Sequence, residues 1–254
     1  MLAKHSSVRA MQYPMTFWSI FFGSVGELLV QVLFFSLIYL AGATSIGGWS
    51  VAEVILLQAM TGIVASIELF LFGANIGQIP RLIRTGRLDK ALLLPINTQL
   101  LLSCYTLSPE WLISGLVNVP LLVWAVRQLE IKMTLGLWLH TSLLVFVGVT
   151  VSYALSFIPA TLAFWKENIF SVQALVSEVV NFRNYPISIF PAKYHWLIMH
   201  VFPIALISNF PTLAITSQLT AYQSGVAVIT ALALLALTRI IFHKGLARYT
   251  SPGG

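Results

Sequence analysis

Three acidic side chains lie inside long apolar stretches of the sequence. Glu27 precedes Gln31 by four residues, so on a helix the two side chains share one face. Glu68 lies in the later half of a second apolar stretch, and Glu178 lies near Gln173 in another. A charge at the centre of a bilayer costs about 2.5–3.5 kcal/mol on insertion scales. We therefore expect these residues to line a translocation path or a subunit interface, the alternative being hydrogen bonds between neighbouring helices.

Other chemistry-bearing motifs are sparse. No GxxxxGK[ST] pattern occurs, so ATP binding through a P-loop is not expected, and no HExxH occurs. His195 and His200 are five residues apart, which does not place them on one helix face, and we expect interfacial histidines rather than a metal site. Cys104 is the single cysteine, which excludes an intrachain disulfide and a cysteine metal cluster. The sequence predicts no catalytic residue and no cofactor.

The composition indicates the solvent in which these residues must function. Of the 254 residues, 58% are hydrophobic and only 9% are charged, against about 25% charged in soluble domains. The mean hydropathy is +0.88. These values exclude a soluble globular domain and a disordered chain. The net charge of +6 is spread among apolar stretches, which indicates membrane topology rather than nucleic-acid binding.

The elements that position these residues are predicted to be membrane-spanning helices, each about 20 residues long. We expect an all-α integral membrane protein with one domain, residues 1–254. The six expected spans are 17–42, 51–76, 98–126, 135–164, 166–182 and 224–242. Residues 1–16 are expected to hold an interfacial helix. The third span is expected to be kinked at Pro109, which follows a potential helix cap, Ser108.

Residues 192–220 are harder to assign, because the apolar run from 194 to 207 is too short to cross a bilayer alone. If both termini are cytoplasmic, the number of crossings is even. Six crossings place ten basic residues in cytoplasmic segments and four, including Arg183, in outer segments, which follows the positive-inside rule. Residues 192–220 are then expected to form a re-entrant helical segment in the outer half of the membrane, broken near Pro203 or Pro211.

The most basic loop follows the second span. Arg81, Arg84, Arg87 and Lys90 recur every three residues among leucines and isoleucines. Such a stretch is expected to lie along the membrane surface with its basic side toward water. It has two interpretations: a topology determinant that contacts anionic lipid, or a docking surface for a soluble partner.

At this loop the chain resembles a known family. Residues 86–95, Gly-Arg-Leu-Asp-Lys-Ala-Leu-Leu-Leu-Pro, are similar to the G-x-L-D-x-x-L-L-x-P stretch of ABC-2-type permeases, in particular their uncharacterised bacterial branch. Tyr185-Pro186 followed by Ile189-Phe190-Pro191 resembles the same group, as does the pair Pro203 and Pro211. Leu94 is a departure, because many members carry a basic residue there.

The resemblance implies a mechanism in which two permease chains pair, identical or homologous, and two cytoplasmic ATPase subunits bind ATP and Mg²⁺. Segment 79–90 would be the main coupling element and 165–168 the second, with Asp89 fixing the loop by pairing with Arg87 or with the partner. The implied coupling residues are Arg81, Arg84, Gly86, Arg87, Leu88, Asp89, Lys90, Pro95, Lys166 and Glu167.

The resemblance also implies export across a bacterial inner membrane. The outer segment that would line or gate the exit contains Tyr185, Pro186, Pro191, Pro203 and Pro211. Two alternatives from other classes remain: a secondary transporter or channel that works without ATP, and a membrane assembly factor. Internal repeats and discontinuous helices mark many secondary transporters, and no convincing repeat is present.

Overall fold

The computed structural model describes residues 14–251, and their regular structure is helical apart from one isolated bridge between Ile46 and Trp49. The expected interfacial helix lies almost entirely outside the described residues. Five helical stretches are long and apolar enough to cross a membrane: 18–40, 51–84, 109–128, 135–164 and 221–246.

These stretches correspond to the following elements. α2 (Pro14–Leu40) is the first, and the second comprises α3 (Val51–Glu68), a π-helix η1 (Leu69–Gly73), α4 (Ala74–Ile76) and α5 (Ile79–Arg84). The third comprises α8 (Pro109–Leu116) and α9 (Val119–Gln128). The fourth is α10 (Leu135–Thr161) with the 3-10 turn η2 (Leu162–Phe164), and the last is α14 (Ala221–Leu246).

Local sequence signals explain where two of these helices begin. Ser50 caps α3, and Glu53 reaches back to the Ser50 backbone nitrogen at 2.8 Å. Thr220 and Gln223 form the same reciprocal arrangement at the start of α14. Such capping boxes satisfy backbone N–H groups that lack partners within the helix.

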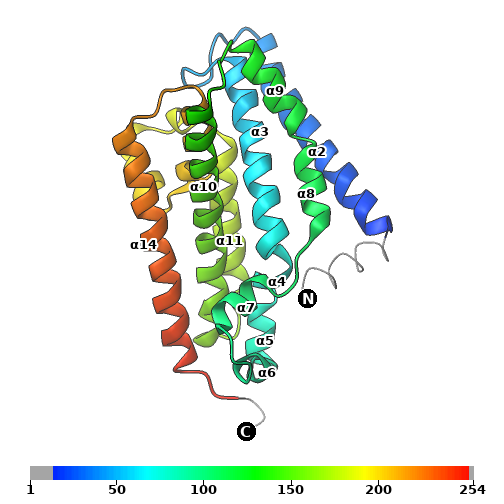
Figure 1. Ribbon diagram of the computed structural model, residues 1–254, viewed down its shortest axis with the longest axis vertical. Coiled ribbons are helices and arrows are strands. Elements are labelled where there is room, and N and C mark those ends of the chain that lie inside the picture. The colour runs from blue at the N-terminus through cyan, green and yellow to red at the C-terminus, as the bar shows by residue number, and fades with distance from the viewer. Residues whose placement is uncertain (1–13, 252–254) are drawn as a thin grey trace.

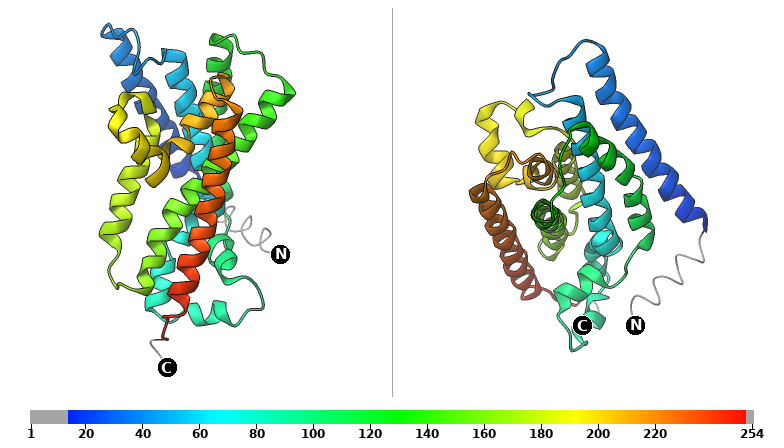
Figure 2. Two further views of the ribbon diagram at one scale, coloured as in Figure 1. Left: turned by 90° about the vertical axis from the view of Figure 1, so that its left-hand side faces the viewer. Right: turned by 45° about the horizontal axis from the view of Figure 1, so that its top comes forward.

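The helices run roughly along one axis, so the molecule has two ends (Figure 1). At the lower end lie α5, α6 (Leu88–Leu92) and the chain after α14, whereas the loop after α2 and the loop between α9 and α10 lie at the upper end. The second view places residues 185–201 in the upper half (Figure 2). The basic loop and the segment proposed to gate the exit therefore lie at opposite ends.

α10 forms the centre of the bundle. In its most apolar stretch 67% of residues are buried, against 6% for α2, which lies at the edge. Val147, Val151 and Leu155 of α10 pack into one cluster with the residues around Ile207. Near the lower end, Phe157 packs in a second cluster with Phe242 of α14.

The third expected span, 98–126, differs from the structure. Residues 98–104 form a separate short helix, α7 (Thr98–Cys104), and the membrane-length stretch begins only at Pro109, so the expected kink is in fact a helix start. Ser108 has φ −118° and ψ 78°, because a residue before proline disfavours the α conformation. α7 is apolar because Leu101 and Leu102 are buried, not because it continues the span.

Between α10 and α14 the chain is divided into short helices. α11 (Phe170–Asn181) has 12 residues and is not among the membrane-length helices. After it come η3 (Phe182–Asn184), η4 (Ile187–Ile189), α12 (Ala192–Trp196), the π-helix η5 (Leu197–Val201), η6 (Ile204–Leu206) and α13 (Asn209–Ile215). The helical break expected near Pro203 is confirmed, since Phe202 and Pro203 are not helical, whereas Pro211 lies inside the first turn of α13.

Candidate functional site

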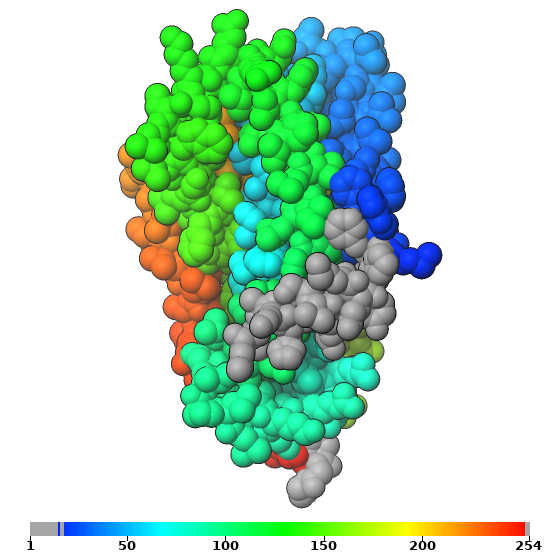
Figure 3. Space-filling view, turned by 45° about the vertical axis from the view of Figure 1, so that its right-hand side comes forward, coloured from blue at the N-terminus to red at the C-terminus, as the bar shows by residue number. Residues whose placement is uncertain are grey.

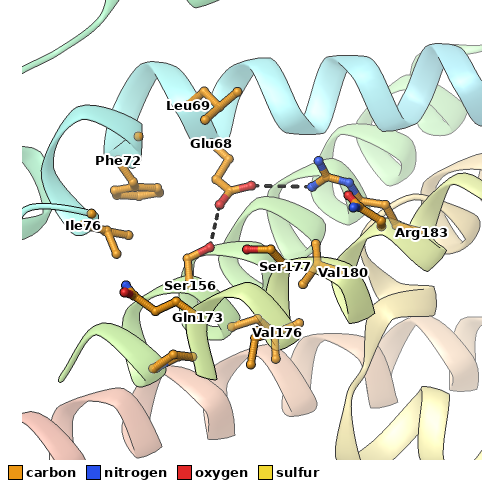
Figure 4. A pocket seen from close by; sticks show the side chains of 15 residues that line it. Glu68, Leu69, Phe72, Ile76, Ser156, Gln173, Val176, Ser177, Val180 and Arg183 are labelled. Atoms are coloured by element: carbon orange, nitrogen blue, oxygen red, sulfur yellow. Dashed lines mark hydrogen bonds and ion pairs between the residues drawn. The ribbon is translucent and has the colours of Figure 1, made fainter. Parts of the chain in front are cut away.

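A largely buried ion pair joins α3 to the turn after α11 (Figure 4). The carboxylate of Glu68 lies 3.6 Å from Nη1 of Arg183, and the two side chains are 13% and 17% exposed. Ser152 Oγ donates to Glu68 Oε2 at 2.6 Å, and Ser156 Oγ donates to Glu68 Oε1 at 3.0 Å. Both carboxylate oxygens are therefore hydrogen-bonded, as a charge in this environment requires.

The secondary structure explains how three segments bring these groups together. Glu68 is the last residue of α3, and the π-helical turn η1 follows it directly. Such turns occur frequently at functional sites. Ser152 and Ser156 are four residues apart on α10, which places both hydroxyls on the same face of that helix.

Arg183 is held by the chain turn that follows α11. Ser208 Oγ donates to the Arg183 carbonyl at 2.6 Å, and Gln58 Nε2 donates to the Asn184 carbonyl at 2.7 Å. Asn209 accepts from the Ile187 N–H at 2.8 Å and donates to the Tyr185 carbonyl at 3.2 Å. The buried side chains of Gln58, Ser208 and Asn209 thus fix the backbone turn from which the Arg183 side chain extends.

A cavity of about 330 Å³ adjoins the ion pair. Its polar lining includes Glu68, Ser156, Gln173 and Arg183, and Figure 4 shows these side chains among Phe72, Ile76, Val176 and Val180. The cavity therefore has a mixed wall in which one carboxylate and one guanidinium adjoin apolar side chains. Such a wall can contact a polar or charged group attached to an apolar body.

Arg183 also lines a neighbouring cavity of about 190 Å³, together with Glu27 and Gln31. Gln31 Nε2 donates to Glu27 Oε1 at 3.3 Å, which confirms that the two share one face. Two of the acidic residues found in the sequence therefore lie on cavities that share Arg183. Glu178 does not join them, because its side chain is exposed and lines neither cavity.

The basic loop at the lower end forms two short helices rather than one. α5 ends before Gly86, which has φ +69°, and α6 follows. A positive φ favours glycine, which explains this residue at the turn. The basic side chains of the loop are exposed, whereas Ile79, Ile83 and Leu88 are buried, as the amphipathic pattern predicts. The exposed basic residues are Arg81, Arg84, Arg87 and Lys90.

Asp89 has a partner that the sequence did not indicate. Its Oδ2 accepts from Ser251 Oγ at 2.6 Å, and among the described residues no ion pair joins it to Arg87. Tyr249 packs beside this contact, against Phe164 of η2. Burial, together with the nearby Asp89 carboxylate, raises the pKa of the Tyr249 phenol, so the group is neutral at neutral pH. The chain after α14 thus fixes the geometry of the loop.

The second coupling segment expected from the resemblance, 165–168, lies next to the basic loop. α5 packs against η2, and the exposed Lys166 and Glu167 follow that turn. Asn168 accepts from the Phe170 N–H at 3.1 Å, at the start of α11. Pro95 is exposed at the end of the loop. In a space-filling view the segment around residues 79–104 occupies the lower end of the molecule (Figure 3).

The upper segment contains the remaining predicted residues. Pro186, Pro203 and Pro211 are buried, Tyr185 packs edge-on against Phe35 of α2, and Pro191 is exposed. His195 contacts the Phe190 carbonyl and His200 stacks on Trp196. Within residues 14–251, no three histidine, cysteine or acidic side chains cluster as a metal site would require.

The sequence reasoning missed Arg183 and the two serines. The count of basic residues places Arg183 in an outer segment. In the structure it contacts Glu68, the last residue of α3, and α3 begins at the upper end. Serines at positions i and i+4 on an otherwise apolar helix were the signal that could have indicated a partner for Glu68.

The fold and this interior define a class: a polytopic helical membrane protein with charged cavities between its helices. The family described as ABC-2 family transporter protein matches residues 25–253. The chain belongs to this family, whose members are membrane components of transporters and are not themselves enzymes. No curated protein and no solved structure matches the chain.

Proposed function

We propose that this chain is the permease subunit of an ATP-driven exporter in a bacterial inner membrane. It would pair with a second permease chain, identical or homologous, and couple to ATPase subunits that bind ATP and Mg²⁺. The family supports the transport role. The observation that carries the coupling role is the exposed basic row of the 79–95 loop, which is fixed on a buried apolar base at the lower end.

The direction of the helices supports six crossings with both termini cytoplasmic. α10 ends at the lower end and α14 begins at the upper end, so the chain between them has to traverse the bundle once (Figure 1). α11 with the segment after it makes this crossing, although α11 alone is about 18 Å long. Residues 192–220 then form the re-entrant segment, and the basic loop faces the cytoplasm.

The Glu68–Arg183 cavity is the proposed translocation path. Its polar groups lie between α3, α10 and α11, and the irregular turn η1 forms one wall. Glu27 supports a paired arrangement, because it is exposed on the edge helix α2 and an exposed carboxylate is costly in lipid. A second chain seated against α2 would cover it.

Charge reversal in the loop tests the coupling role. We propose that Arg84 and Arg87 bind an acidic groove on the ATPase. In the variant Arg84→Glu/Arg87→Glu, like charges would meet that groove. Truncating one side of a buried interfacial charge pair costs about 2–5 kcal/mol, so we expect more than a tenfold loss in affinity. Co-purification of the partner ATPase with the chain, and its permease-dependent ATP hydrolysis, would measure the effect.

Arg127→Glu is the matched control, because Arg127 is exposed at the upper end. Arg81 and Lys90 still hold the loop inside, so insertion should survive the double change. A loop that contacts only lipid predicts an intact complex. Normal insertion together with wild-type ATPase yield and activity in the double variant would show that the loop does not dock the ATPase.

A further inference from the structure

A third cavity, of about 600 Å³, lies apart from the Glu68–Arg183 pair. Its wall comes from α3 with η1, α7, α10 and α14, and it is mainly apolar, with side chains such as Leu71, Val149 and Leu235. Its size is within the usual range for small-molecule sites, about 300–1,000 Å³. The permease role proposed above does not involve this cavity.

A hydrogen-bonded network fixes one wall. Gln99 of α7 donates from Nε2 to Tyr153 Oη at 3.2 Å and to Thr238 Oγ1 at 3.1 Å. Ser103 and Tyr153 are joined by their hydroxyls at 2.9 Å. These bonds tie α7 to both α10 and α14. The network thereby pairs the Gln99 amide nitrogen with the Tyr153 and Thr238 hydroxyls and holds this wall in place. Gln99 Oε1 is buried without a hydrogen-bond partner among the described residues.

The cavity opens on the outside of the bundle. Leu100 of α7 and Phe146 of α10 both line it and are 64% and 68% exposed. In a membrane protein, exposed apolar side chains on an outer helix face contact lipid tails. An acyl chain from the surrounding bilayer can therefore reach the cavity from this side of the bundle.

One end of the cavity carries a charge. Arg239 is the only charged residue in its described lining, and it is exposed. Its Nη1 donates to Asn97 Oδ1 at 3.1 Å, which leaves the other guanidinium donors free of ion pairs in the described part of the chain. Arg239 lies about two turns before the end of α14, in the part of the helix nearest the lower end (Figure 1).

We propose that this cavity binds an anionic phospholipid of the surrounding leaflet. One acyl chain occupies the apolar interior, and the phosphate contacts Arg239 and Asn97. Arginine binds phosphate through several N–H donors in a fixed geometry. A net anionic headgroup matches a lining with one cation and no carboxylate.

The test uses Cys104, which lines this cavity and is the single cysteine of the sequence. Its rate of reaction with a maleimide in the purified full chain therefore reports occupancy without any engineered residue. We expect phosphatidylglycerol to slow labelling at lower concentration than phosphatidylcholine with the same acyl chains. Glycerol phosphate, which has the charge but no chain, should give no protection.

Arg239→Gln should raise the phosphatidylglycerol concentration for half-protection about tenfold, the factor that corresponds to about 1.4 kcal/mol. Arg248→Gln, at an exposed basic residue outside the cavity, should change nothing. Equal protection of the wild-type chain by both lipids would contradict the proposed preference for an anionic headgroup. Protection by glycerol phosphate would contradict the proposal that an acyl chain occupies the cavity. Unchanged lipid preference in Arg239→Gln would overturn the assigned phosphate contact.

Discussion

At the scale of single residues, the Glu68–Arg183 pair allows two charged side chains to lie between the helices. Each member neutralises the other in a site where an isolated charge is strongly disfavoured. The two serines give the carboxylate hydrogen bonds that do not depend on Arg183. Arg183 is less well supplied: Nη1 makes one long hydrogen bond, to Ser152 Oγ at 3.4 Å, and Nε is buried without a hydrogen-bond partner among the described residues.

Removing both members should therefore destabilise the protein by less than the sum of the two single removals. We expect Glu68→Gln and Arg183→Gln each to lower the free energy of unfolding, by about 3 kcal/mol for a buried pair. The double variant should lose less than the sum of the two, because no charge is left without a partner. Thermal unfolding in detergent measures these differences. Glu178→Gln, at an exposed carboxylate, is the control, and strictly additive losses would mean that the pair is not coupled.

The same substitutions distinguish a path from a packing contact. Glu→Gln keeps the shape of the side chain and removes its charge. If Glu68 and Glu27 line the path, at least one of the variants Glu68→Gln and Glu27→Gln should change permease-dependent ATP hydrolysis in a correctly assembled complex. Wild-type assembly and activity in both variants would leave only helix packing as their role.

At the scale of elements, the close approach of α10 to the segment before α13 holds the upper half together. A Cβ added at Gly148 would collide with the Ile207 carbonyl, which is backbone and cannot rotate away. Residues 207–209 also position the turn that carries Arg183. A change at Gly148 therefore acts on the ion pair through the docking of this segment.

Gly148→Ala should destabilise the protein, because either α10 or the 204–207 backbone has to shift. Gly136→Ala is a matched control on the same helix, since a Cβ there meets nothing within 4 Å. In a helix, alanine is favoured over glycine by roughly 0.5–1 kcal/mol, so the control should be neutral or slightly stabilised. Thermal unfolding of both variants measures the difference. Equal midpoints would mean that the approach at Gly148 does not limit packing.

How far the sequence predicts this structure differs between elements. Long apolar runs predicted the first, second, fourth and last membrane-length helices, because burial in lipid requires such runs. α7 was misassigned because a short helix packed inside the bundle has the same composition as part of a span. Glu68 was found because a charge in an apolar run is conspicuous, whereas its partner Arg183 lies in a mixed segment whose depth depends on tertiary contacts with residues 58, 208 and 209.

At the scale of the whole molecule, the proposed six-crossing topology predicts which positions an external thiol reagent can label. In a Cys104→Ser background, single cysteines at Ser45 and Ser188 should react with an impermeant thiol reagent added to intact cells. Both residues are exposed, and they belong to the loop after α2 and to the segment 185–201, which lie in the upper half (Figures 1 and 2). A cysteine at Ser251 should react only after the membrane is permeabilised. External labelling at 251 in intact cells would contradict the proposed six-crossing topology.

The contact between Asp89 and Ser251 also bears on biosynthesis. The two residues are 162 positions apart. The buried base of the basic loop includes Phe242, and the partly buried Tyr249 packs against it. During synthesis this base therefore cannot assemble until α14 and the residues after it have left the ribosome. A nascent chain would present its arginines on a loosely packed segment, and the surface proposed for the ATPase would mature last. A truncated chain would then be distinguishable from a finished one by its inability to recruit that partner.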